Sequence, residues 1–393
     1  MRVCFISHSS KRQGAELSLI ETIDALKKTQ VECHVILPSD GPLVDELKRR
    51  GIPFFITRYS WWVRKKSPPW NYPKAVLAGL INIVASVAIA ARIRKWNCDV
   101  IYTNTITVCV GAIAAKLLGR PHVWHIHELG YGGHGFSFDL GNGISMWIMD
   151  RCSSICIANS LAVKRKFQEY FDEAKLRVVY NSLGLVPREF CETAQYKNRI
   201  DPCLRCVLVG SLQEGKRQED AVQAIAKLIS DGLKVELLMV GAGDPKYYSH
   251  LQGIIVQKGV GSSIEFAGQL DDPFPLIRDA DVLLMCSMCE AFGRVTVEAM
   301  LFGKPVIGAR SCGTIELVSD GFNGYLYEPT DYEDLAEKIR YLYHNRDVAK
   351  KMGENGRQWA NCEFNEERLR QELMGILEQV CPSKEPKPKE AEM

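Results

Sequence analysis

The chain has 393 residues, of which 46% are hydrophobic and 24% are charged. This composition is typical of a globular protein with about two domains, and it excludes collagen-like, disordered and coiled-coil classes. The formal net charge of +2 is too small for a nucleic-acid binder held by bulk charge. Residues 1–185 carry a net +10, however, and residues 186–393 a net −8. The N-terminal half is therefore expected to face an acidic partner.

Short β-branched runs alternate with helical patterns along the whole chain, which predicts βαβ units and buried parallel sheets. In the first half the expected strands are Val3–Ser7, Glu32–Leu37, Phe54–Thr57, Val100–Thr103, Val123–His125, Ser154–Ala158 and Arg177–Val179. In the second half they are Cys206–Val209, Lys234–Val240, Ile264–Ala267, Asp281–Met285 and Pro305–Gly308. The predicted fold class is α/β, with two doubly wound, Rossmann-like domains that face each other across a ligand cleft.

A polar stretch with two prolines, Pro187 and Pro202, interrupts the alternation and marks the domain boundary. The expected organisation is a first Rossmann-like domain at 1–185, a linker at 186–202 and a second Rossmann-like domain at 203–380. The last helix of the second domain is expected either to stay with it or to pack back on the first domain. The charged, Pro-rich residues 381–393 are expected to be disordered.

The cysteines do not suggest a disulfide framework, although the chain has 14 of them. Most lie inside apolar runs, where Cys acts as a small hydrophobic residue. The chain starts directly with a strand pattern instead of a signal peptide, so a reducing, cytoplasmic location is expected. Two CxxC pairs, Cys203/Cys206 and Cys286/Cys289, precede and follow their strands respectively. Four ligands at opposite strand ends do not converge on one zinc ion, so these cysteines are predicted to be free and no metal site is expected.

The segment Ala75–Ala91 has no charged residue over 17 positions. It falls where the pattern requires a crossover helix, and it is interpreted as a buried helix in preference to a membrane span. Two tryptophans and three basic residues precede it: Trp61, Trp62, Arg64, Lys65 and Lys66. They are interpreted either as an anchor on an anionic membrane surface or as a loop that packs on its own domain.

The most informative segment runs from Glu290 to Glu298, between a predicted strand and a predicted helix. Free N–H groups at the start of a helix bind anions, and Gly293 allows close approach of a ligand to the backbone. A carboxylate such as that of Glu298 accepts hydrogen bonds from paired hydroxyls. Two carboxylates that bracket an anion pocket suit a phosphorylated sugar.

These residues form the pattern Glu-x-Phe-Gly-x-x-x-x-Glu-Ala-Met, followed by Gly-Lys-Pro-Val from Gly303. The pattern closely resembles the E-x7-E motif of retaining glycosyltransferases with the GT-B fold, of the group 1 or family 4 type. Residues 313–324 are similar to the GGxPE stretch of that family, with Cys312 in place of the first Gly and Ile315 in place of Pro. The resemblance covers nearly the whole chain.

The resemblance implies a donor site for a UDP- or GDP-sugar. Glu290 would lie beside the sugar, Glu298 would hold the ribose hydroxyls, and Lys216 would contact the diphosphate. Ser211 stands where the family has a phosphate-binding Arg, and the sequence leaves open whether Arg217 replaces it. The other implied donor contacts come from the backbone and from loops: Gly14, Gly268, Gln269, Leu270, Phe292, Gly293, Arg294 and Val295.

His127-Glu128 resembles the His-acid pair of the family, in which the His lies beside the transferred sugar. Alternation along the strand places His125 and His127 on the same face. The catalytic set implied by the resemblance is Glu290, His127 and Lys216, with no cofactor and no divalent metal. The implied reaction transfers a sugar to a glycan or lipid-linked acceptor with retention of configuration. The net +10 of the first half and the Trp61–Lys66 segment lead to the further expectation of a cytoplasmic enzyme that sits reversibly on the inner face of the membrane, with a soluble acidic acceptor as the alternative explanation of the charge. The N-terminal domain would receive the acceptor.

Three other functions remain possible at this point. Gly241-Ala242-Gly243 follows a strand, as in nucleotide-dependent oxidoreductases, but no third Gly completes the G-x-G-x-x-G spacing. A GT-B epimerase would convert the nucleotide sugar without an acceptor. A catalytically idle scaffold would bind no nucleotide.

Overall fold

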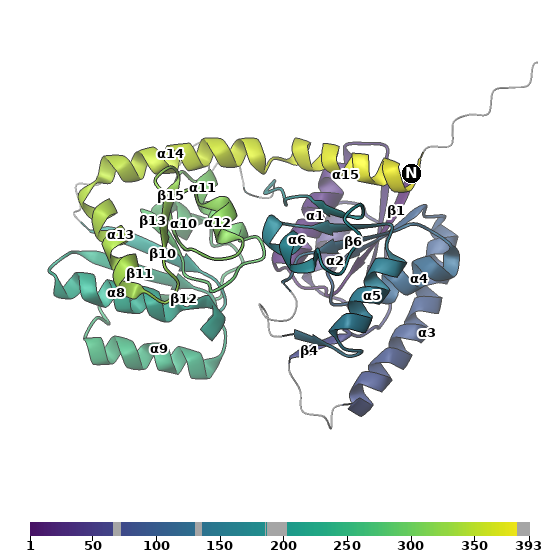
Figure 1. The fold of residues 1–393 in the computed structure, drawn as a ribbon, viewed down its shortest axis with the longest axis horizontal. Coiled ribbons are helices and arrows are strands. Elements are labelled where there is room, and N and C mark those ends of the chain that lie inside the picture. The colour runs from purple at the N-terminus through teal and green to yellow at the C-terminus, as the bar shows by residue number, and fades with distance from the viewer. Residues whose placement is uncertain (66–71, 130–135, 185, 187–202, 383–393) are drawn as a thin grey trace, which may run out of the picture. The chain divides into compact units, whose positions relative to one another are not determined.

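The computed structural model describes residues 1–65, 72–129, 136–184, 186 and 203–382. The chain divides into two compact units, and each has its own sheet and core (Figure 1). Unit 1 comprises residues 1–159, 164–182 and 366–393, and unit 2 comprises residues 160–163 and 183–365. Residues 187–202 of the predicted linker lie outside the described residues, as do residue 185 and residues 383–393 of the predicted tail.

Unit 1 is built on a parallel sheet with the strand order β3-β2-β1-β5-β6-β8-β9. The strands are β1 (Arg2–Ser7), β2 (Glu32–Leu37), β3 (Phe54–Ile56), β5 (Val100–Asn104), β6 (His122–Ile126), β8 (Ile155–Ala158) and β9 (Leu176–Val178). The helices are α1 (Gly14–Lys27), α2 (Pro42–Arg49), α3 (Tyr72–Trp96), α4 (Val110–Leu118), α5 (Asn142–Cys152) and α15 (Glu366–Val380). Helix α6 (Leu161–Phe167) has its first three residues in unit 2 and the rest in unit 1. The last helix, α15, packs against α1, although unit 2 precedes it in the sequence.

Unit 2 contains a second parallel sheet, with the order β12-β11-β10-β13-β14-β15. Its strands are β10 (Leu204–Val209), β11 (Val235–Val240), β12 (Ile264–Gly268), β13 (Val282–Met285), β14 (Val306–Ala309) and β15 (Gly324–Tyr327). Its helices are α8 (Gln218–Ser230), α9 (Pro245–Lys258), α10 (Phe274–Asp279), α11 (Arg294–Leu301), α12 (Thr314–Leu317), α13 (Tyr332–His344) and α14 (Arg346–Glu363), together with a short 3-10 turn at Glu214–Lys216.

The predicted class of two parallel-sheet α/β domains is confirmed. Every predicted strand is present, and its ends agree within about two residues. The prediction omitted β15 and the antiparallel pair formed by β4 (Val63–Lys65) and β7 (Phe136–Phe138). These three are short and lie at sheet edges or in a two-stranded ribbon, where the apolar pattern is weak.

The prediction of a buried helix at Ala75–Ala91 is only half right. The segment is helical as part of α3, but only 39% of its most apolar 18-residue window is buried. One side of α3 packs in the core of unit 1 through Ala85, Ile89 and Ile93. The opposite side carries exposed side chains such as Val84, which is 71% accessible. By length and hydropathy alone, residues 73–96 are also long and apolar enough to cross a membrane.

The interpretation of Trp62 and Arg64 as membrane-anchor residues is wrong. Trp62 is buried, its ring stacks on Trp124, and its indole N–H donates to the Ile106 carbonyl at 2.7 Å. The Arg64 guanidinium donates to Asp139 at 2.6 Å. Sequence patterning did not reveal these partners, because they lie 44 to 75 positions further along the chain. Trp61 remains 42% exposed, and Lys66 lies outside the described residues.

Candidate active site

The strand order of unit 2 reverses between β10 and β13, which lie side by side. Strands β11 and β12 are added on one side of β10, and strands β13, β14 and β15 are added on its other side. Loops that leave the carboxyl ends of strands at such a reversal diverge, and ligands bind there in open α/β sheets. The loops concerned are 210–217 after β10 and 286–293 after β13.

Lys216 and Glu290 form an ion pair that joins these two loops. The two side chains are 26% and 14% exposed, so the pair is largely shielded from solvent. The backbone reinforces the junction, because the N–H of Met288 donates to the carbonyl of Gly215 at 3.0 Å. Two residues that are 74 positions apart, and that sequence reasoning assigned to one site, are thus brought into contact.

Helix α11 begins directly after the Glu290 loop. Gly293 precedes it at φ +94°, a left-handed conformation that glycine adopts without strain. The first backbone N–H groups of α11 therefore lie at the end of the Glu290 loop. Such free N–H groups at a helix N-terminus favour a negatively charged ligand. Glu298 lies one turn further on, is buried, and is paired with Arg294 at 3.7 Å. It is therefore not a solvated surface carboxylate.

A turn that follows β14 contacts the Glu290 loop and fixes its position. The N–H of Gly313 donates to the Glu290 carbonyl at 2.9 Å, and the hydroxyl of Ser160 donates to the carbonyl of Ala291. A disulfide joins Cys289 to Cys312 across the same contact. The prediction that Cys289 is a free cysteine is therefore wrong, because two loops 23 residues apart meet here. Cys206 and Cys286 are buried and take part in no disulfide.

Arg217, the candidate for the phosphate-binding Arg, is paired with a carboxylate of its own unit. Arg217 caps the turn that holds Lys216 and adopts φ +51°. Its guanidinium donates to the buried carboxylate of Asp220 at 2.6 Å, and this hydrogen bond raises the pKa of Arg217. Ser211 is exposed, and its carbonyl accepts from Gln218 at 2.9 Å. The Arg217 charge is thus balanced within unit 2 by Asp220.

The Gly241–Gly243 pair is explained by loop packing. The N–H of Gly241 donates to the carbonyl of Gly268 at 2.7 Å, and the N–H of Leu212 donates to the carbonyl of Ala242 at 3.1 Å. A Cβ at Gly243 would collide with the backbone of Leu212. These glycines let the ends of β10, β11 and β12 approach closely. Gln269 and Leu270, which follow β12, are exposed at this edge.

In unit 1, Asn104 at the end of β5 connects two predicted site segments. Its amide N–H donates to the carbonyl of Ala15, at 2.9 Å, and its oxygen accepts from Nε2 of His127, also at 2.9 Å. Nδ1 of His127 faces the amide of Asn159 at 3.4 Å. These contacts favour the neutral tautomer of His127 with the proton on Nε2. Gly14, the first residue of α1, is exposed next to this contact.

His125 and His127 lie on one face of the strand end, as predicted, with ring centroids 4.0 Å apart. His125 is fully buried, and its Nδ1 contacts the Tyr102 hydroxyl at 2.7 Å. Burial lowers the pKa of His125 to about 3, so its ring is neutral at physiological pH. His125 is therefore a core residue, whereas His127 is partly accessible.

Sequence reasoning missed a buried polar cluster at the end of β1. The carboxylate of Glu16 accepts from the Ser9 hydroxyl at 2.5 Å and lies 3.3 Å from Nε2 of His8. Burial lowers the pKa of His8. His8 follows the first strand directly, so its place at the carboxyl edge of the sheet was the available signal. Over the described ranges of the chain, no group of three His, Cys, Asp or Glu is arranged to hold a metal ion.

Comparison with known proteins decides the family. Residues 12–183 match the model described as Glycosyltransferase Family 4, and residues 199–359 match the model described as Glycosyl transferases group 1. An uncharacterised glycosyltransferase of Methanocaldococcus jannaschii is 36% identical over 276 residues, which are 67% of this chain and 72% of that protein. The chain belongs to the glycosyltransferase family.

Two further relatives of this glycosyltransferase carry information about ligands and pathways. Anabaena HepE, solved in complex with UDP, is 25% identical with a TM-score of 0.78, and the match covers 96% of this chain and 100% of that one. HepE has also been solved in complex with UDP-glucose. The capsular polysaccharide biosynthesis glycosyltransferase CapM of Staphylococcus aureus is 25% identical over 174 residues, 42% of this chain and 43% of CapM.

The close contact between Gly313 and the Glu290 loop predicts that a side chain at position 313 displaces the loop. A Cβ on Gly313 would lie 2.8 Å from the carbonyl oxygens of both Glu290 and Ala291, so Gly313→Ala must push the loop away. We expect a loss of about 1–3 kcal/mol in the free energy of unfolding, the usual cost of overpacking. Gly215→Ala is the matched control, because a Cβ there meets no atom within 4 Å. Equal thermal midpoints for both variants and the wild type would contradict the packing described.

A second prediction concerns Glu128. Burial raises the pKa of its carboxyl to about 7, against the hydrogen bonds from the Ile106 and His127 amides, which lower it. The folded state therefore holds a proton that the unfolded state releases near pH 4.5. The stability that Glu128 contributes falls as pH rises from about 5 to 8. Urea denaturation should show the wild type losing stability relative to Glu128→Gln across that range; a pH-independent difference would rule this out.

Proposed function

We propose that this glycosyltransferase moves a sugar from a UDP-sugar to an acceptor hydroxyl in glycan or glycolipid assembly, with retention of configuration. The observation that carries the proposal is the contact between Lys216 and Glu290 at the strand-order reversal, next to the start of α11. UDP is favoured over GDP because HepE, which is 25–26% identical, binds UDP and UDP-glucose. The role of CapM in capsular polysaccharide biosynthesis supports a surface-glycan product.

In this proposal the diphosphate displaces Glu290 from Lys216. The ammonium group of Lys216 then contacts the phosphate oxygens, while the first amides of α11, at Arg294 and Val295, donate to the diphosphate. Negative charge grows on the leaving diphosphate as the glycosidic bond breaks, and donors already in place stabilise that charge. No divalent metal takes part, so EDTA should leave the activity unchanged.

The released Glu290 carboxylate accepts hydrogen bonds from sugar hydroxyls, and the backbone N–H groups of Phe292 and Gly293 donate to hydroxyl oxygens of the sugar. Glu298 accepts hydrogen bonds from the two ribose hydroxyls, and residues 268–270 contact the uracil base. His127 contacts the transferred sugar from the N-terminal unit, oriented by Asn104. No carboxylate is assigned as a covalent nucleophile. The leaving phosphate takes the proton of the acceptor hydroxyl, so that the acceptor attacks from the face the leaving group occupied.

The kinetic test separates the two donor contacts. Lys216→Ala should lower kcat by about 10²-fold or more, because the charge that Lys216 stabilises grows in the transition state. Glu298→Gln should mainly raise KM for the UDP-sugar, because ribose contacts are the same in the ground and transition states. Lys227→Ala is the control: it removes an exposed ion pair with Asp231 in the same unit and should change neither constant.

Wild-type constants in both Lys216→Ala and Glu298→Gln would place the donor elsewhere. The epimerase alternative is separated by incubation with UDP-sugar alone, because an epimerase converts the donor without an acceptor and a transferase does not. The oxidoreductase alternative has lost its main support, because the Gly241–Gly243 pair is accounted for by loop packing.

A further inference from the structure

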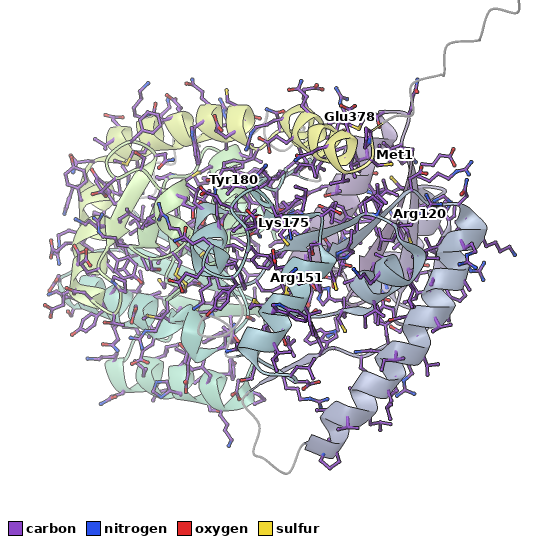
Figure 2. All side chains as sticks on the ribbon, turned by 45° about the vertical axis from the view of Figure 1, so that its right-hand side comes forward. Met1, Arg120, Arg151, Lys175, Tyr180 and Glu378 are labelled. Carbon is purple, nitrogen blue, oxygen red and sulfur yellow. A yellow bond between two sulfur atoms is a disulfide. The ribbon has the colours of Figure 1, made fainter. Side chains whose placement is uncertain are left out.

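Helix α3 presents an apolar stripe to solvent along its outer side. Six large side chains on that side are between 56% and 71% exposed: Val76, Leu77, Leu80, Ile83, Val84 and Val87. Their spacing of three and four residues places them on one side of the helix, over about 17 Å at 1.5 Å per residue. Figure 2 shows side chains of α3 directed away from the body of unit 1.

Helix α5 and the chain just before it add further exposed apolar side chains. Trp147 is 60% exposed, Ile144 58% and Leu140 53%. Helix α4 packs against both α3 and α5, and it contributes Leu117, which is 57% exposed. We call these residues and the α3 stripe the outer apolar face. Exposed apolar side chains gathered on three helices that pack one against the next indicate an interaction site.

The charged residues on the three helices of the outer apolar face are mostly positive, and Asp139, which precedes Leu140, is paired with Arg64. Helices α3, α4 and α5 carry six basic residues, Lys74, Arg92, Arg94, Lys95, Lys116 and Arg151, and one acidic residue, Asp150. Asp150 is paired with Lys175 at 3.2 Å. Arg120, which follows α4, adds another exposed cation; it and Arg151 are labelled in Figure 2.

The combination of positive charges and apolar side chains favours an anionic lipid bilayer over a second copy of the chain as the partner of this face. A second copy of the chain docked face to face would bring two sets of these cations together, which is unfavourable. A bilayer with anionic headgroups accepts the cations at its surface and the apolar side chains at the boundary with the acyl chains. Trp147 suits the headgroup layer, where tryptophan is enriched in membrane proteins.

The packing of α3 also distinguishes lying on a membrane from spanning it. Its inner side contributes Ala85, Ile89 and Ile93 to the core of unit 1, and Asn82 accepts from the N–H of Ser60 at 2.8 Å. A spanning helix would have to leave this core. We propose that unit 1 docks reversibly on an anionic lipid bilayer through the outer apolar face, with α3 in the plane of the interface.

Co-sedimentation of the full chain with vesicles tests this proposal. Wild-type protein should pellet with vesicles of phosphatidylcholine and phosphatidylglycerol, and less so with phosphatidylcholine alone or at high salt. Leu80→Ser/Val84→Ser/Val87→Ser should lower the partition coefficient at least tenfold. Val256→Ser is the matched control, because Val256 is an 80% exposed apolar residue on α9 of unit 2. It should bind like the wild type.

A second variant tests the charge contribution without touching the apolar stripe. Lys74→Ser/Lys116→Ser/Arg151→Ser should weaken binding to anionic vesicles at low salt and leave the residual binding to neutral vesicles unchanged. Because all the altered side chains are exposed, thermal melting should match the wild type and show that both triple variants fold.

Three results would overturn the proposal. The first is equal recovery of wild-type protein in the supernatant with and without anionic vesicles. The second is undiminished binding of the apolar triple variant, which would assign the membrane contact to another surface. The third is absence of vesicle binding together with a wild-type dimer, seen by sedimentation velocity, that the apolar triple variant abolishes. That result would assign the face to a second copy of the chain.

Discussion

The candidate donor site depends on one topological constraint, the reversal of strand order between β10 and β13. Parallel pairing aligns the ends of these strands, so the loops that follow them start side by side and then diverge. The ion pair between Lys216 and Glu290 closes the space between the loops. The start of α11 lies next to this pair, and its free amides add the partial positive charge that an anionic ligand requires. Without the reversal, residues 74 positions apart would have no reason to meet.

The same constraint explains the order in unit 1, where the sheet reverses between β1 and β5. Asn104 ends β5 at that point, and its side chain bonds both the Ala15 carbonyl and His127. The loop after β1 and the end of β6 are thereby fixed relative to each other. Helices α3, α4 and α5 follow one another along the sheet, and their outer sides carry the exposed apolar and basic residues. The sheet of unit 1 thus carries polar residues at the carboxyl ends of its strands, while helices α3, α4 and α5 carry the outer apolar face.

Most of the fold could be predicted from the sequence, because parallel strands are local patterns, and the family resemblance placed Lys216 and Glu290 in one site, where they form an ion pair. The donor-binding roles stay predictions. Buried parallel strands are short apolar runs, and the Glu290–Glu298 spacing is contained within one loop and one helix. What could not be predicted depends on partners far along the chain. The Cys289–Cys312 disulfide joins two loops. The ring of Trp62 packs against Trp124 and Phe138, and Arg217 forms an ion pair with Asp220. The exposure of α3 likewise depends on which neighbours cover it.

Hydrogen–deuterium exchange of the full chain, with and without UDP, tests the central claim most directly. The site at the strand-order reversal predicts slower exchange in peptides that cover residues 210–217 and 287–298, because bound diphosphate engages or shields the amides of both loops. Peptides from α9 and α13, on the same unit but away from this edge, should exchange at unchanged rates. Saturating UDP that slows exchange in neither loop, or only in segments away from both, would contradict the assignment.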